Sequence, residues 1–326
     1  MVFTNFPNGI TSLGVPTFGA GGLLPFTGNY WWVNETTGSD GNTGNDPAFP
    51  LKTLAQAQSN ATATNNDVVF VTGSIHVTKT LVWAKNWVHL IGLAAPNNNP
   101  RARISTQTVA NGLTQTQFSA LHPQVSVTAS GCIFANLENF YGGDGTLTPP
   151  TAAVAWADTG GRNYYYNVRF AGGGDALMAA LAGMRSLTLG PGDESVLEKC
   201  IIGLDTVQRA TAVNASLELL SGTARNVFRA CTFEMNTSLA TDLHVTVGAS
   251  GMDRYALFDG CVFINAVDST STTINAAIVA NAAAGGSVVL NNPISLGATA
   301  LATTGPVYVT GAVPTATTSG IAIKAT

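Results

Sequence analysis

Carboxylate side chains are the first candidates for chemistry in this sequence, because cleavage of a glycosidic bond uses two of them, about 5–5.5 Å or about 6.5–9.5 Å apart. The chain has only 18 aspartates and glutamates among its 326 residues. Glu198 and Asp259 fall at matching positions of a repeat of 30 to 32 residues, with Arg229 midway between them. In a stack of strands the two acids would be two rungs, or roughly 10 Å, apart. This spacing predicts a ladder of alternating charge rather than an acid–base pair.

The other acidic residues of interest lie in turns. Asp193 and Glu194 follow a Gly-Pro-Gly string, where solvated carboxylates are ordinary. Asp144, Asp158 and Asp175 occupy Gly-rich loops and are the best remaining candidates for catalysis, but aspartate is also a common capping residue of such turns. A polysaccharide lyase would need clustered calcium-binding aspartates beside a base, and no such cluster adjoins a Lys or Arg. We therefore expect no catalytic residue and a protein that is not an enzyme.

Histidine and cysteine indicate no metal site. The four histidines have neither metal-ligand spacing nor Ser/Asp partners, and they are His76, His89, His122 and His244. Three of the four cysteines share one position of the repeat, namely Cys200, Cys231 and Cys261. This predicts a ladder of small, buried, reduced thiols rather than disulfides or zinc ligands. We expect no metal ion and no cofactor.

Charge and composition argue against several classes of protein. Only 10% of the residues are charged, and the net charge at pH 7 is −4. The absence of any Lys/Arg cluster argues against binding to nucleic acid. No apolar run is long enough for a membrane span, and the N-terminus lacks the basic region and apolar core of a secretory signal. We expect a protein that is made in the cytoplasm and that binds neither nucleic acid nor membrane.

A short apolar stretch, seen best at residues 227–233, recurs along the chain. The fifth position of its copies falls at 137, 168, 200, 231, 261 and 293. A fixed period of this size is typical of a stacked repeat architecture. The copies hold strand-type residues between spacers rich in Gly, Asn and Thr, and no helical stripe alternates with them. The sequence therefore predicts a β-solenoid.

Each column of the repeat has a predicted orientation. The second, fifth and seventh positions are apolar, and a bend near the fourth position lets all of them point into the core. The first position should then face outward, yet all of its residues are apolar: Ile133, Tyr164, Val196, Val227, Leu257 and Val289. We call these six residues the outer stripe. An unbroken apolar stripe on an outer face indicates burial against another chain.

The segment before the repeats has a recognisable order. It contains an apolar YWWVN string at 30–34, GSDGNTG at 38–44 and PAFPLKTLAQA at 47–57. This order resembles the entry to right-handed parallel β-helix proteins of the pectate-lyase-like group, where residues 30–66 would form a strand, a turn-rich loop and a short helix capping the open end. Residues 67–93 resemble the first full coil. Residues 94–130 are interpreted as an inserted loop, within which residues 101–104 are a candidate for resuming the solenoid. The resemblance implies an all-β fold, a single-stranded right-handed parallel β-helix over 67–310, with a C-terminal tail or cap over 311–326.

Residues 1–29 are interpreted as an N-terminal docking arm. Pro, Gly and Asn interrupt the segment too often for a regular element, but it is too apolar for an idle linker. The strings NFPNG at 5–9 and SLGVP at 12–16 resemble the leader of tailed-bacteriophage virion proteins. The apolar residues expected to dock are Phe3, Phe6, Pro7, Ile10, Leu13, Val15 and Phe18.

Two functions follow from these resemblances. The first is a structural virion protein, a homotrimeric β-helix that decorates or projects from a phage capsid. Its arm would bind the major capsid protein or another virion protein, and the outer stripe would form the contact between protomers. The alternative is a tailspike or receptor-binding protein that binds or depolymerises a bacterial surface polysaccharide. That alternative calls for a groove with two acids and exposed aromatic side chains.

Overall fold

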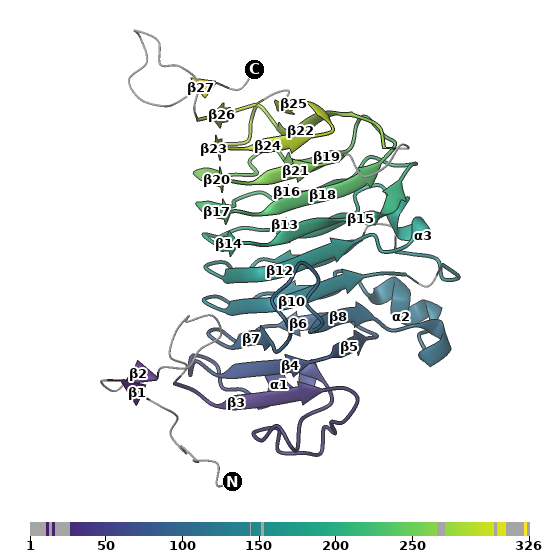
Figure 1. Cartoon of the computed structure of the whole chain (residues 1–326), viewed down its shortest axis with the longest axis vertical. Helices are drawn as coiled ribbons and strands as arrows, with labels where there is room; N and C mark the ends of the chain where they lie inside the picture. The colour runs from purple at the N-terminus through teal and green to yellow at the C-terminus, as the bar shows by residue number, and fades with distance from the viewer. Residues whose placement is uncertain are drawn as a thin grey trace.

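The chain forms a right-handed parallel β-helix in which strands stack coil upon coil along one axis (Figure 1). The computed structural model describes residues 11–12, 15–16, 27–143, 145–150, 153–265, 271–302, 305–310 and 323–324. Within these residues the solenoid has about seven turns and three α-helices. The predicted fold class is therefore confirmed.

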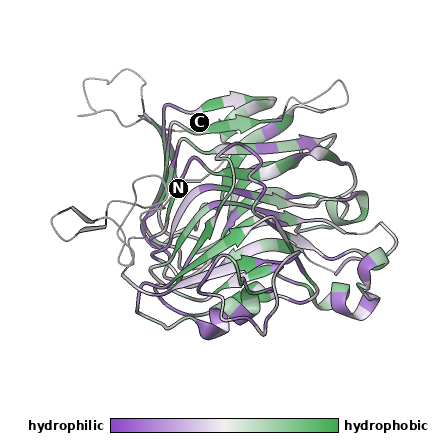
Figure 2. Ribbon diagram, turned by 60° about the horizontal axis from the view of Figure 1, so that its bottom comes forward, coloured by the Kyte–Doolittle hydropathy of each residue, from purple (hydrophilic) through white to green (hydrophobic). Residues whose placement is uncertain are grey.

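Two sheets run the length of the solenoid, and nearly all of their neighbouring strands are parallel. The first sheet contains β3 (Tyr30–Asn34), β4 (Val68–Thr72), β5 (Ser74–Val77), β7 (His89–Gly92), β8 (Arg103–Thr106), β10 (Ile133–Tyr141), β12 (Tyr164–Gly172), β14 (Val196–Glu198), β15 (Ile201–Arg209), β17 (Asn226–Arg229), β18 (Thr232–Thr237), β20 (Tyr255–Asp259), β21 (Val262–Ile264), β23 (Ser287–Asn291), β24 (Ile294–Leu296) and β26 (Val307–Val309). The second sheet contains β6 (Leu81–Trp83), β9 (Val125–Val127), β11 (Val154–Asp158), β13 (Arg185–Leu189), β16 (Ala215–Leu219), β19 (Leu243–Val247), β22 (Ile274–Ala280) and β25 (Ala298–Ala302). The hydrophobic segments in Figure 2 follow these strands, whereas the connecting turns are more hydrophilic.

The predicted bend at the fourth position of the repeat is confirmed by the backbone. Every copy has a left-handed φ there, between 48° and 61°, at Asn136, Asn167, Lys199, Ala230, Gly260 and Asn292. A single left-handed residue breaks the strict alternation of a strand. The residues on its two sides can therefore both point inward, which is why the fold needs the bend at this position.

The core is a set of columns in which like side chains stack on successive coils. Phe228 and Phe258 stack with ring centroids 4.5 Å apart, and Phe233 and Phe263 do so at 4.9 Å. Aromatic pairs of this kind contribute about 0.5–1.5 kcal/mol beyond the burial of their area. Four cysteines are free and buried, so the predicted ladder of reduced thiols at Cys200, Cys231 and Cys261 is confirmed, whereas Cys132 lies just before β10 and outside that column.

A short helix covers the N-terminal end of the solenoid. Helix α1 (Leu54–Asn60) lies against the first strands (Figure 1) and buries Leu54 and Ala57. Thr53 caps the helix, and the carboxylate of Asp40 accepts hydrogen bonds from the backbone of Lys52 and from both the backbone and hydroxyl of Thr53. Capping and turn formation therefore account for these polar residues, and the open end of the core is closed.

Residues 94–130 do more than form a loop. They include β8, which pairs with β5 and β10 in the first sheet, and β9, which pairs with β6 and β11 in the second sheet. Between these strands lie the short helices η2 (Val109–Asn111) and α2 (Gln115–Ala120). The interpretation of the whole segment as an inserted loop is corrected here, because Ile104, Val125 and Val127 are buried core residues.

The two ends of the chain contribute small antiparallel elements. β1 (Thr11–Ser12) pairs with β2 (Val15–Pro16), and β27 (Ile323–Lys324) pairs with β26. The latter pairing covers backbone groups of the last parallel strand, which limits edge-to-edge association. The expected docking residues Phe3, Phe6, Pro7, Ile10, Leu13 and Phe18 lie outside the described residues, and Val15 is described only as part of β2.

Replacement of Phe228 tests the assignment of the core. Phe228→Ala should lower the free energy of unfolding by about 3–5 kcal/mol, because it removes a fully buried ring and leaves a cavity. Phe49, which is 59% exposed, provides the control, and Phe49→Ala should change stability by less than about 0.5 kcal/mol. Urea unfolding followed by fluorescence measures both, and equal effects would contradict the assigned core.

Candidate functional site

The aspartates considered for catalysis have structural roles where the structure describes them. Asp158 is fully buried and accepts hydrogen bonds from Asn163, from Tyr165 and from two backbone amides. Asp175 is the N-cap of α3 (Ala176–Ala179), and one of its oxygens accepts hydrogen bonds from two backbone amides of that helix. Asp144 lies outside the described residues. Asp158 is therefore fully hydrogen-bonded, whereas Asp175 caps the helix through one oxygen and its other oxygen is buried without a hydrogen-bond partner.

The ladder of Glu198, Arg229 and Asp259 has the expected register but not the expected contacts. Strand pairing places Glu198 opposite Arg229 and Arg229 opposite Asp259. Glu198 instead accepts a hydrogen bond from Tyr164 at 3.1 Å, and Asp259 accepts one from Asn291 at 2.6 Å. Within the described part of the chain Arg229 forms no ion pair with either acid, so the prediction of an alternating-charge ladder is wrong in this respect.

The outer stripe is a continuous row along the first sheet. Each member pairs in register with the next, and β26 adds Tyr308 after Val289. Ile133 is buried against Val68, Ile91 and Ala135 of its own chain. The later members are half-buried, and Tyr308 is 40% exposed. The row is therefore partly exposed to solvent over the later coils, from Val196 to Tyr308, in the described chain.

A charged cleft lies on the outer face of the same sheet. Arg103, Glu138 and Arg169 occupy one row of strand register, and Arg103 Nε lies 2.7 Å from Glu138 Oε2. The guanidinium of Arg169 contacts Glu234 of β18 and lies 3.6 Å from Asp205 of β15. Two arginines and three carboxylates are thus brought together over successive coils. The sequence contained one signal for this cleft. Glu138 and Arg169 both occupy the sixth position of the repeat, in two successive copies, which puts opposite charges on adjacent coils.

Two charged groups of the cleft are buried although they lie on the outside of the sheet. Glu138 is 3% exposed and Arg169 is 7% exposed. Asn99 accepts a hydrogen bond from Arg169, and Asn98, Asn99 and Arg101 line a cavity of about 470 Å³ together with the charged side chains. The Nε atom of Arg169 is buried without a partner. Buried charges oppose folding unless they are well paired, and their concentration in a cleft is typical of a functional site.

Glu234 has a raised pKa. Its carboxyl pKa is about 7, because burial and, to a smaller extent, the charge of Asp205 raise it by more than the guanidinium of Arg169 lowers it. Since ionised and protonated forms of Glu234 are then both populated near neutral pH, the strength of its ion pair with Arg169 depends on pH. Such a group can exchange a proton with a ligand.

A second cavity, of about 540 Å³, adjoins the cleft on the same face. Both cavities border the connection between β7 and β8, and the second is lined mainly by Leu93, Pro96, Ala135 and the ring of Tyr166. The ammonium group of Lys199 lies 5.4 Å from the centre of that ring. An aromatic ring at the edge of a polar groove can stack against an apolar face of a ligand.

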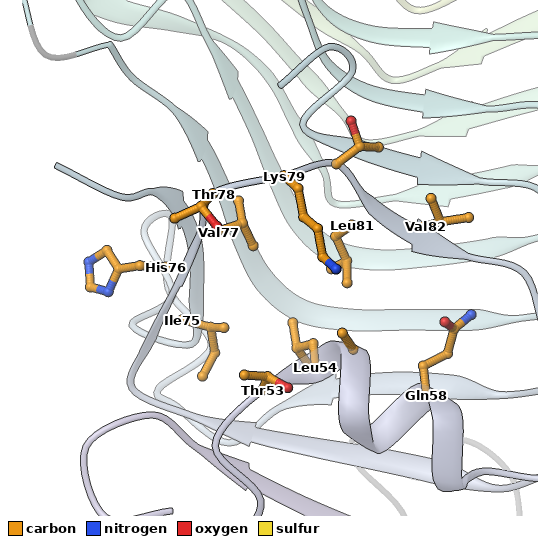
Figure 3. Close-up of a pocket in the computed structure, with 12 residues that line it drawn as sticks. Thr53, Leu54, Gln58, Ile75, His76, Val77, Thr78, Lys79, Leu81 and Val82 are labelled. Atoms are coloured by element: carbon orange, nitrogen blue, oxygen red, sulfur yellow. The ribbon is translucent and has the colours of Figure 1, made fainter. Parts of the chain in front are cut away.

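A third cavity, of about 460 Å³, lies at the N-terminal cap (Figure 3). It is formed between α1 and residues 75–82, with Leu54, Ile75 and Leu81 as its apolar floor. Its residues 75–77 belong to β5, which pairs with β8 beside Arg103, but no residue lines both this cavity and the charged cleft. Among the described residues, no group of three or more His, Cys, Asp or Glu is arranged for a metal ion, and no helix is long and apolar enough to cross a membrane.

Comparison with known proteins identifies related folds. No family model and no curated protein matches the sequence. Among solved structures, pectin methylesterase PemA from Erwinia chrysanthemi matches with a TM-score of 0.48 and 16% identity over 81% of this chain and 78% of that chain. A pectin methylesterase from Aspergillus niger matches with a TM-score of 0.46 and 14% identity over 83% and 77% of the two chains. These likenesses bear on the fold alone.

The expectation that the chain is not an enzyme is contradicted by these matches. The solved proteins that share its β-helix fold are enzymes. At identities of 13–16% none of their catalytic residues is transferred to this chain.

The titration of Glu234 gives a test of the cleft. Its folded pKa of about 7 exceeds the ordinary value of 4.5, so its contribution to stability is largest at low pH and is lost as the pH rises from about 4.5 to about 7. Over this range wild type should lose up to about 3 kcal/mol more than Glu234→Gln, at about 1.4 kcal/mol per pH unit. Urea unfolding at several pH values measures the difference.

A matched control removes another arginine partner. Glu218 Oε2 lies 2.8 Å from Arg185 Nε in the second sheet. The variant Glu218→Gln shows whether the loss of an ion pair alone changes the dependence of the unfolding free energy on pH. Identical pH curves for wild type and Glu234→Gln would contradict the raised pKa of Glu234.

Proposed function

We propose that the chain is a structural protein of a tailed-phage particle that assembles as a homotrimer, with residues 1–29 attaching it to the major capsid protein or another virion protein. One observation carries the proposal, namely the continuous apolar row formed by the outer stripe and Tyr308 along the first sheet. The leader-like strings at residues 5–16 support the virion assignment.

The geometry of the row suits an interface between copies. Val196, Val227, Leu257, Val289 and Tyr308 follow one another at about 4.8 Å intervals, over roughly 20 Å. Each is partly exposed in the single chain. Burial of such surface stabilises an assembly by about 25 cal/mol per Å², and a cyclic arrangement buries the same row on every copy.

Charge substitution in the row tests the assembly. We expect wild type to sediment at three chain masses and the double variant Val227→Glu/Leu257→Glu to sediment at one, because buried unpaired carboxylates strongly oppose association. Val213, which is 53% exposed in a turn away from the row, provides the control, and Val213→Glu should remain trimeric. A monomeric wild type, or a double variant that stays trimeric with native circular dichroism, would contradict the proposal.

The virion assignment has a separate test. Antibody labelling of phage particles in the electron microscope locates the protein and counts its copies. Hundreds of copies on the shell would support a decoration protein, and a few copies at the tail would support the alternative of a receptor-binding protein. Absence from the particle would contradict both.

The charged cleft favours a second candidate function, the binding of a bacterial surface polysaccharide. Carboxylates and guanidinium groups together offer the acceptors and donors that sugar hydroxyls need, and the ring of Tyr166 borders the adjoining cavity. Asp205 and Glu234 beside Arg169 supply the two acids expected for this alternative.

A glycan array of O-antigens and capsular polysaccharides tests the second candidate. Arg169→Gln should weaken binding at least tenfold, because each lost hydrogen bond to a charged group costs about 1.5–3 kcal/mol. Arg185→Gln, which alters an ion pair in the second sheet, serves as the matched control. The same samples are examined for shortening of the polysaccharide. Equal binding by both variants would exclude the cleft as the site.

A further inference from the structure

Asp193 is a buried carboxyl group that the sequence pattern placed in solvent. It follows a Gly-Pro-Gly turn, yet it is 0% exposed. The turn is held between two neighbouring turns, because the Arg162 amide donates to the Asp193 carbonyl at 2.6 Å and the Glu194 amide donates to Ala224 at 2.7 Å. Stacking of coils therefore forces this side chain into the interior.

Neither carboxyl oxygen of Asp193 has a hydrogen-bond partner. The amide nitrogen of Asn226 is the nearby donor, but it too is buried without a partner in hydrogen-bond geometry. A buried carboxylate without donors or a cation is strongly disfavoured, and such a group takes up a proton instead. Burial, and then the charge of Asp158, raise the pKa of Asp193 to about 9.

Asp158 on the preceding coil has the opposite environment. Its carboxylate accepts hydrogen bonds from the Asn163 amide, from the Tyr165 hydroxyl at 2.8 Å and from the amides of Gly160 and Gly161. Burial raises the pKa of Asp158, and these donors oppose the increase. The donors suit an ionised Asp158, which leaves Asp193 as the protonated member of the pair.

The remaining charged groups around the pair do not neutralise Asp193. Tyr165 is fully buried, and its raised pKa keeps it neutral. Glu194 on the same turn is paired with Arg162 on one neighbouring turn and with Arg225 on the other. Both arginine side chains are well exposed, at 72% and 47%, so solvent screens their charge at the buried pair.

We propose that Asp158 and Asp193 form a proton-dependent switch between adjoining coils, in which the turns pack tightly only while Asp193 carries a proton. Loss of that proton places two negative charges in the interior and favours separation of the turns. Folding between about pH 4 and pH 9 then takes up one proton at this site, and the unfolding equilibrium constant rises tenfold per pH unit from this group alone.

Urea unfolding of wild type and Asp193→Asn between pH 5 and pH 8 tests the switch. The ratio of the wild-type unfolding constant to that of Asp193→Asn should rise about tenfold per pH unit. Asp253→Asn, at a residue with a 57% exposed side chain, serves as the control and should follow wild type. A constant ratio for Asp193→Asn would overturn the proposal, because Asp193 would then be ionised in the folded protein.

If Asp193→Asn does not fold, infrared spectroscopy tests directly whether Asp193 is protonated in the folded protein. The Glu234→Gln variant lacks the carboxyl group of Glu234, whose pKa is about 7, and at pH 8 its Asp193 should give the infrared carbonyl band of a protonated carboxyl group. The band should disappear when the pH is raised above about 9, the pKa of Asp193. Absence of the band at pH 8 would overturn the proposal.

Discussion

The left-handed bend at the fourth position of each repeat is the constraint on which the rest of the structure depends. It lets two sets of apolar side chains point inward from one long strand, so the aromatic columns and the thiol ladder stack in register. The first column then faces outward on every coil. The same geometry that builds the core therefore also produces the apolar row on the outer face.

Features that repeat with the period of the coils could be predicted from the sequence. The stacked phenylalanines, the buried cysteines, the bend and the register of the outer stripe all follow from one 30–32-residue spacing. The contacts of Glu198 and Asp259 could not be predicted, because register fixes which residues are neighbours but not which partner a flexible side chain selects. Glu198 hydrogen-bonds to Tyr164, which lies in the outer stripe.

Features that depart from the period escaped prediction. The cleft combines Arg169 with Asn99 from the β7–β8 connection and with Asp205 and Glu234, which do not share its column. Asp193 was expected in solvent because Gly-Pro-Gly turns are usually exposed, but close stacking of coils buries the turn that carries it. Both sites contain carboxyl groups whose burial raises their pKa, so the stability of the solenoid depends on pH at these two places.

An electron cryomicroscopy structure of the full-length protein in solution tests the central claim most directly. The account expects three copies around one axis, with Val196, Val227, Leu257, Val289 and Tyr308 of each copy in contact with its neighbours. A single chain in solution, or an assembly in which this row faces solvent, would contradict it.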